Sequence, residues 1–195
     1  ADVKMGAGAD SVELDQVTKG SIYLGTGDDS LSAADNVSQV LIQTSDGKNT
    51  FGLADADTIT LISGDGNDKL TSTNTADGLL SSSFDLAGGK DDADIDGKLD
   101  KSELKLGDGD DTVNIAKAST TSTIYGGSGA DNFVAAETLT KFLIQDNDGV
   151  SKFDFAAATS STISSGEGAD TIDFAGALTL SSYTSNGGND TISVT

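Results

Sequence analysis

Apolar residues recur along the chain in two registers, and the spacing within each register is 19 or 20 residues over most of its length. A period of this size is typical of a solenoid, in which each repeat forms one coil that stacks on the next. Stacking would turn each register into an inward ladder, one on each face of the coil. The first register contains Val12, Leu31, Phe51, Leu70, Val113, Phe133, Phe153, Ile172 and Ile192. The second contains Ile22, Ile42, Leu61, Leu104, Ile124, Ile144, Ile163 and Tyr183.

A short glycine–aspartate turn joins the second register to the next member of the first. Six copies fit the pattern Gly-x-Gly-x-Asp-x-apolar, and a seventh has Asn186 in place of the first glycine. Two worn copies, around Gly47 and Gly149, carry Asn49 and Ser151 at the acidic position. The interval from Asp68 to Asp111 is 43 residues, so we expect it to hold two repeats and a few extra residues.

These patterns predict an all-β fold, a right-handed parallel β-solenoid or β-roll of about ten coils of 19–20 residues. We expect residues 1–195 to form one elongated domain, cut from a longer repetitive chain. Apolar residues make up only 35% of the chain, which suffices for the thin core of a solenoid. The absence of proline suits uninterrupted strand stacking.

Composition narrows the possible partners. The net charge is −21, from 32 acidic and 11 basic residues, so we expect no binding to nucleic acid phosphates. No segment approaches the apolar length that a bilayer requires, so we expect no membrane insertion. The chain has neither cysteine nor histidine, which leaves oxygen as the ligand type for a metal ion.

Oxygen ligands at the regular turns point to calcium. Glycines allow backbone conformations in which carbonyl oxygens face inward, and the aspartate adds a carboxylate. Calcium accepts many oxygen ligands in loose geometry, and stacked carboxylates repel one another unless cations lie between them. The candidate metal ligands of the turns are Gly6, Gly8, Asp10, Gly25, Gly27, Asp29, Gly64, Gly66, Asp68, Gly107, Gly109, Asp111, Gly127, Gly129, Asp131, Gly166, Gly168, Asp170, Gly188 and Asp190.

A second calcium motif lies in the stretched interval. Residues 92–103 match the loop of an EF-hand at its ligand positions and at the glycine of its sharp turn. We therefore expect an EF-hand-like loop inserted into a coil, with a structural role. Its candidate ligands are Asp92, Asp94, Asp96, Lys98 through its carbonyl, Asp100 and Glu103.

The run from Gly126 to Phe133, Gly-Gly-Ser-Gly-Ala-Asp-Asn-Phe, resembles the repeat unit of the RTX family in full. The resemblance implies a parallel β-roll, type I secretion, folding on extracellular calcium, and ions held between adjacent turns. RTX rolls repeat the motif about every nine residues, which places calcium turns on both edges. Here only every second half-coil carries it, so we expect one dense calcium row.

The function that this resemblance implies is structural. We expect a calcium-dependent building block of the bacterial cell surface, as in S-layer and surface-sheath proteins, that self-associates into an extracellular array. The alternative is the stalk or binding module of a secreted RTX adhesin or enzyme. Ice binding is a further alternative, although the threonine ladder that it needs is interrupted at residues 39–41 and 141–143. Without histidine a serine triad cannot form, so we expect no enzyme activity.

Overall fold

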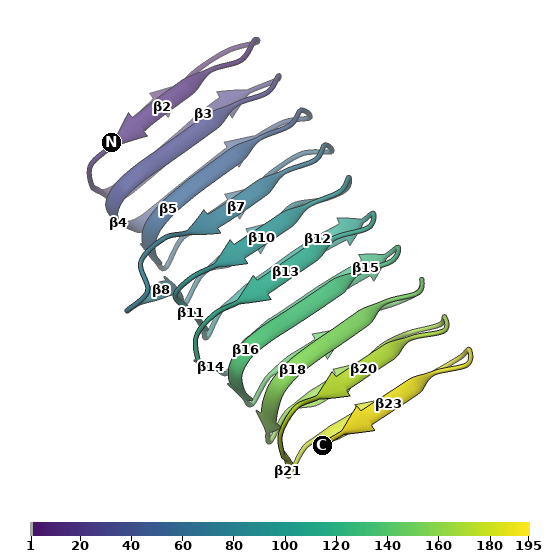
Figure 1. Cartoon of the computed structure of the whole chain (residues 1–195). Coiled ribbons are helices and arrows are strands. Elements are labelled where there is room, and N and C mark those ends of the chain that lie inside the picture. The colour runs from purple at the N-terminus through teal and green to yellow at the C-terminus, as the bar shows by residue number, and fades with distance from the viewer. Residues whose placement is uncertain (1) are drawn as a thin grey trace.

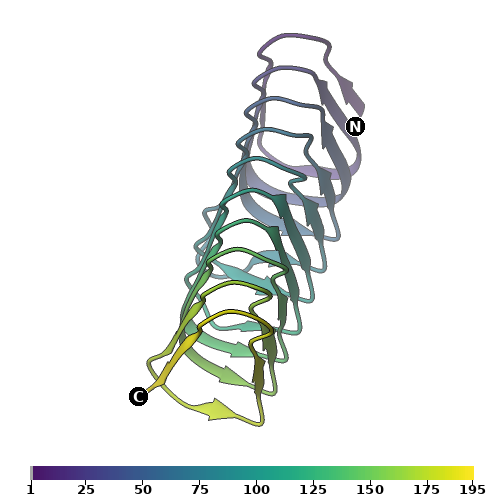
Figure 2. The same ribbon diagram turned by 90° about the vertical axis from the view of Figure 1, so that its right-hand side faces the viewer.

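The computed structural model describes residues 2–195, and all regular structure in that range is β-strand. Twenty-three strands pair in parallel to form one continuous sheet that winds into a rod (Figure 1). The rod is a β-solenoid of about ten coils, as the repeat predicts. Figure 2 shows the coils as a stack of similar loops, with the two termini at opposite ends. No helix in residues 2–195 is long and apolar enough to cross a membrane.

Each coil has two faces and a short strand segment between them. The outgoing face follows a glycine–aspartate turn and contains β2 (Ser11–Leu14), the first part of β4 (Ser30–Thr44), the first part of β5 (Thr50–Asp57), β7 (Lys69–Ser72), β10 (Asp92–Ile95), β13 (Thr112–Ile115), the first part of β16 (Asn132–Thr140), the first part of β18 (Lys152–Thr159), β20 (Thr171–Phe174) and β23 (Thr191–Val194).

The returning face leads into the next turn and contains β1 (Asp2–Lys4), the last part of β3 (Val17–Gly25), the last part of β4, β6 (Thr60–Ile62), β9 (Ser83–Asp85), β12 (Glu103–Asp108), β15 (Thr123–Ser128), β17 (Leu143–Gln145), β19 (Thr162–Ser164) and β22 (Ser182–Thr184). The short segment contains β8 (Gly78–Leu80), β11 (Lys98–Asp100), β14 (Ser119–Thr120), β21 (Leu178–Thr179) and parts of β3, β4, β5, β16 and β18.

Both apolar registers form ladders, as the sequence predicts. On the outgoing face Val12 pairs with Leu31, Leu31 with Phe51, and Phe51 with Leu70. On the returning face Ile22 pairs with Ile42, in a ladder that continues to Tyr183. The ladder residues are buried, except that Tyr183 is partly buried and Ile192 is 50% exposed, since the last coil has no described neighbour on one side.

The stretched interval holds a turn that the sequence reading did not resolve, at residues 87–91. Its Gly89 and Asp91 follow the repeat, but Ala87 replaces the first glycine. The extra residues lie between β7 and β8, because the strand offset is 19 at Leu53–Ser72 and 23 at Ala56–Leu79. The insertion is therefore in residues 73–78.

The expected EF-hand-like loop at 92–103 is not formed, and that prediction is corrected here. The segment supplies β10, β11 and the start of β12, which pair with the coils before and after them. Ala93, Ile95 and Leu99 are fully buried. Burial of these apolar side chains in the core stabilises the strands that the segment forms.

Four aromatic rings fill the core towards the C-terminal end of the rod. The rings of Phe133 and Phe153 stack with their centres 4.8 Å apart, and Phe153 meets Phe155 edge-on at 6.2 Å. Phe155 in turn contacts Phe174 at 5.7 Å. Phe153 and Phe155, which both lie in β18, therefore link their coil to those of Phe133 and Phe174.

Replacement of Phe153 by alanine should lower the free energy of unfolding by about 3–5 kcal/mol, since it removes a fully buried ring and leaves a cavity. Urea unfolding in calcium-containing buffer measures the change. Val150→Ala is the control: this side chain is 63% exposed, so its loss should change stability by less than about 0.5 kcal/mol. Equal effects of the two substitutions would contradict the described core.

Candidate metal site along the glycine–aspartate edge

The glycine–aspartate turns of successive coils lie along one edge of the rod, the upper right edge in Figure 1. We number each turn from position 1 to position 5, so that the acidic residue stands at position 5. The ten turns are residues 6–10, 25–29, 45–49, 64–68, 87–91, 107–111, 127–131, 147–151, 166–170 and 186–190. Isolated parallel bridges, such as Ala7 with Thr26 and Ser128 with Asp148, join neighbouring turns.

Position 3 is glycine in all ten turns, and two geometric constraints require it. Its φ angle is positive throughout, from 112° at Gly149 to 148° at Gly66. A Cβ atom at Gly109 would lie 1.4 Å from the carbonyl oxygen of Gly89, and a Cβ at Gly129 would lie 2.0 Å from that of Gly109. The position 3 carbonyls therefore point along the rod towards the next turn, and no side chain fits between them.

Position 5 side chains form a second ladder along the same edge. The backbone N–H of each position 5 residue donates to a side-chain oxygen of the position 5 residue in the next turn. The nine bonds run without a break from Asp10 to Asp190, with donor–acceptor distances of 2.7–3.1 Å. This ladder explains why aspartate, asparagine and serine occur here, because each offers an acceptor oxygen.

The other carboxylate oxygen of most position 5 aspartates has no partner. The Oδ2 atoms of Asp29, Asp91, Asp111, Asp131 and Asp170 are buried and make no hydrogen bond. Two aspartates differ: Asp68 Oδ2 accepts the Ser63 hydroxyl, and Asp10 Oδ2 accepts the Gly6 N–H at 3.4 Å. A buried carboxylate oxygen without a donor is costly, and five of them follow one edge.

Asn49 shows what this second position faces. Its Nδ2 donates to the carbonyl oxygens of Ser45 at 3.2 Å and Gly47 at 3.1 Å, which are positions 1 and 3 of its own turn. It also lies 3.3 Å from the Ser63 hydroxyl. In an aspartate turn of the same shape, Oδ2 replaces this donor and faces two carbonyl oxygens. The carboxylate oxygen then lies against carbonyl oxygens with no hydrogen between them, and a hard cation bound to all of these oxygens would stabilise the arrangement.

Burial shifts the ionisation of these carboxyl groups. It raises the pKa of Asp91 and of Asp131 to about 7, and the pKa of Asp111 to about 6. Hydrogen bonds from the neighbouring backbone oppose the rise, while the charges of adjacent aspartates add to it. The pKa of Asp68 is also raised by burial, against the lowering effect of its Ser63 hydrogen bond. Without a cation, burial therefore favours the protonated form of Asp68, Asp91, Asp111 and Asp131.

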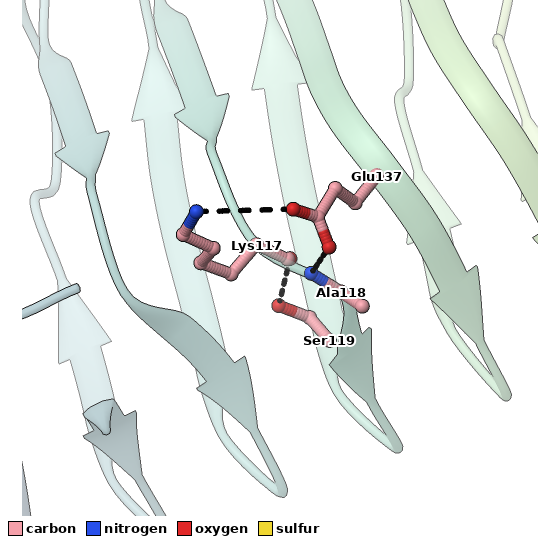
Figure 3. Close-up of polar contacts among 4 residues, drawn as sticks. All are labelled: Lys117, Ala118, Ser119 and Glu137. Atoms are coloured by element: carbon pink, nitrogen blue, oxygen red, sulfur yellow. Dashed lines mark hydrogen bonds and ion pairs between the residues drawn. The ribbon is translucent and has the colours of Figure 1, made fainter. Parts of the chain in front are cut away.

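At the opposite edge, a carboxylate that faces a turn has donors. Figure 3 shows Glu137, which accepts the backbone N–H of Ala118 at 3.1 Å and lies 3.8 Å from the Lys117 ammonium. In the same view the Ser119 hydroxyl donates to the Lys117 carbonyl at 2.9 Å. Glu137 is exposed, so this edge buries no charge here.

The opposite edge also has a ladder of its own, which the sequence reading missed. Five serines, Ser82, Ser102, Ser122, Ser161 and Ser181, each accept an N–H from the preceding coil and donate to a carbonyl two residues earlier. The residue before each serine has a positive φ, between 50° and 55°, and forms a sharp corner. The serine spacing of 20 residues, with one step of 39, was the available signal in the sequence.

The predicted ligands of the middle motif are separated from one another. Asp92 pairs with Lys69, Glu103 pairs with Lys105, and Asp100 accepts the N–H of Thr120. Within residues 2–195 no three acidic side chains converge in the way a metal ion needs. A metal site on this edge would therefore combine one or two carboxylates with turn carbonyls.

Comparisons of the chain with protein-family models, with curated proteins and with solved structures gave no match. The geometry of the repeat is therefore what supports a metal site at this edge.

The raised pKa values predict how the metal-free rod responds to pH. In the unfolded chain an aspartate ionises near pH 3.8, whereas Asp91, Asp111 and Asp131 ionise near pH 6–7 when folded. Between these pH values the folded chain binds more protons than the unfolded chain. The contribution of these groups to the stability of the fold is therefore complete below about pH 3.8 and is lost as the pH rises to about 7. Thermal unfolding in a chelator should give melting temperatures that fall from pH 4 to pH 7. Asp111→Asn should flatten this dependence, and the exposed Asp173→Asn should not; melting temperatures that rise with pH would contradict the assignment.

Proposed function

We propose that the chain is a calcium-dependent structural rod of the bacterial cell surface, in which calcium ions along the glycine–aspartate edge hold successive coils together. The observation that carries the proposal is the row of buried, unpartnered Oδ2 atoms at Asp29, Asp91, Asp111, Asp131 and Asp170. Asn49 supports it, because its amide supplies to the turn carbonyls the positive end that the aspartate turns lack.

Calcium suits this site better than other common ions. The available ligands are carboxylate and carbonyl oxygens, which favour calcium or magnesium over zinc. Magnesium demands near-octahedral geometry and keeps several waters, whereas Asp91, Asp111 and Asp170 are each 1% exposed. Calcium accepts irregular ligand sets, so it fits turns whose position 1 varies between glycine, serine, alanine and asparagine.

Calcium binding on this scale would be coupled to folding. The chain carries a net charge of −21, so the metal-free form repels itself while its core is thin. A metal site that exists only in the folded state adds its binding free energy to the free energy of folding. Extracellular calcium modules bind with dissociation constants of about 0.1–1 mM, which would keep such a chain unfolded in the cytosol and fold it outside.

A structural role follows from the shape of the molecule. A solenoid couples each coil mainly to its neighbours and presents long regular faces, which suits assembly into an extracellular array. The RTX-like turns support the same proposal, and they are equally compatible with the stalk of a secreted adhesin or with the roll of a secreted enzyme.

Removal of calcium should unfold the rod near neutral pH. Circular dichroism of the full chain in EGTA at pH 7.5 and low salt should show a disordered polyanion, and excess calcium should restore the strand signal. Magnesium at the same ionic strength is the control for simple charge screening. A strand signal that survives in EGTA would show that the ions do not hold the fold.

Exchanging asparagine and aspartate between two turns should exchange their need for calcium. In Asp111→Asn the new amide can donate to the carbonyls of Gly107 and Gly109, so the variant should bind about one ion fewer and fold at a lower calcium concentration. Asn49→Asp should bind about one ion more and need a higher calcium concentration to fold. Asp110→Asn makes the same charge change at an exposed neighbour of Asp111 and should do neither. Native mass spectrometry counts the ions, and unchanged counts in both turns would contradict the proposed row.

A further inference from the structure

One inward-facing column runs directly before position 1 of the turns, and it contains a single charged residue. Its members are Met5, Leu24, Thr44, Ser63, Leu86, Leu106, Gly126, Asp146, Ser165 and Ser185. Asp146 is only 3% exposed, and its Oδ2 makes no hydrogen bond. Because the sequence pattern places apolar and small residues in this column, a buried carboxylate here needs a reason of its own.

Asp146 and Asp131 approach each other beside Gly126. A Cβ atom on Gly126 would lie 2.5 Å from Asp146 Oδ1 and 2.6 Å from Asp131 Oδ2. Asp131 is 2% exposed, and this Oδ2 is the atom without a hydrogen-bond partner. The same Cβ would lie 2.9 Å from Phe133 Cζ, and Asp146 Oδ1 also accepts the backbone N–H of Asn147 at 3.1 Å. Two buried carboxylate oxygens thus lie close together beside Gly126, where any larger residue would clash with both.

The position of Asp146 in the repeat gives a second reason to read the pair as a site. Its coil is the one in which Ser151 stands at position 5, so the turn offers no carboxylate at that position. The Ser151 hydroxyl keeps the hydrogen-bond ladder intact by accepting the N–H of Asp131 at 3.0 Å. It cannot supply the negative charge that the aspartate turns have, whereas Asp146, five residues earlier, can.

We propose that Asp131 and Asp146 together bind one calcium ion inside the rod, between their carboxylate groups beside Gly126. This inference rests on the proposed calcium row, because Asp131 belongs to that row, and it adds a ligand from outside the turns. The charges balance, since two carboxylates neutralise one divalent ion. Calcium is favoured over magnesium because these two side chains are almost fully buried and leave little room for retained waters.

The competing occupant is a proton. Burial raises the pKa of Asp131 to about 7 and that of Asp146 to about 6, and the two carboxyl groups influence each other. A shared proton would therefore satisfy the pair in the absence of metal. The two occupants differ in what they predict for the number of bound ions, which makes them separable by experiment.

The test counts calcium ions on the full chain by native mass spectrometry at pH 7.5, after titration with calcium chloride alone. Asp146→Asn and Asp146→Ser should each carry one ion fewer than the wild type, and serine already occupies this column at residues 165 and 185. Gly126→Ala should also lose one ion, because its Cβ would clash with both carboxylates. Two controls should keep the wild-type count: Asp173→Asn, which is exposed, and Gly52→Ala, whose Cβ would lie 3.9 Å from its nearest neighbours.

The outcomes separate this inference from the proposed function. If the wild type binds calcium and the Asp146 and Gly126 variants keep the full count, the pair holds a proton and the inference is wrong, while the row stands. If the wild type binds no calcium, both proposals fail. Should the variants not fold, an anomalous difference map of wild-type crystals grown in calcium decides: a peak between Asp131 and Asp146 supports the site, and its absence overturns it.

Discussion

Five of the aspartate turns bury a carboxylate oxygen that has no donor, and the turn of Asn49 shows that this oxygen faces carbonyl oxygens of its own turn. The stability of the rod depends on how this contact between oxygen atoms is relieved. The contact arises because position 3 must be glycine, which lets the turns stack so closely that the carbonyl of Gly89 lies where a Cβ of Gly109 would be. Close stacking aligns the carboxylates of successive coils as well. Negative oxygens therefore repel one another within a turn, where carboxylate faces carbonyl, and between turns, where carboxylates align. A bound cation would offset both repulsions.

At both edges of the rod, side chains must supply acceptors for backbone N–H groups and donors for backbone carbonyl oxygens, and the two edges use different side chains. At the opposite edge Ser102 accepts the N–H of Ser82 and donates to the carbonyl of Asp100. A hydroxyl both accepts and donates, so a serine corner is complete without an ion. A carboxylate only accepts, so an aspartate turn is complete only with an ion or a proton. Asn49 lies between these cases, since its amide accepts through one atom and donates through the other.

The fold could be predicted from the sequence because burial in a solenoid repeats at a fixed spacing, and the ladders at Ile42 and Phe133 follow directly from it. The turn at 87–91 was missed because Ala87 replaces a glycine and the insertion at 73–78 shifts the period to 23. The EF-hand prediction failed because aspartates at alternate positions also occur on the outer face of a strand. Asp92 and Asp94 alternate here with the buried Ala93 and Ile95. Asp146 was missed because its role depends on Gly126, which lies one coil away.

The neutral position 5 residues divide the row into three groups of aspartates, and the structure treats the two boundaries differently. At Asn49 an amide replaces the missing cation, so the coil stays bonded without one. At Ser151 the hydroxyl accepts the N–H of Asp131 within the ladder, and Asp146 brings a carboxylate from the neighbouring column to the Asp131 side of the boundary. Each coil is coupled mainly to its neighbours. The coil of Asn49 therefore separates the ions bound on either side of it, whereas the coil of Ser151 connects them. The aspartates from Asp68 to Asp190 would then act as one calcium-dependent unit, with Asp10 and Asp29 as a separate one.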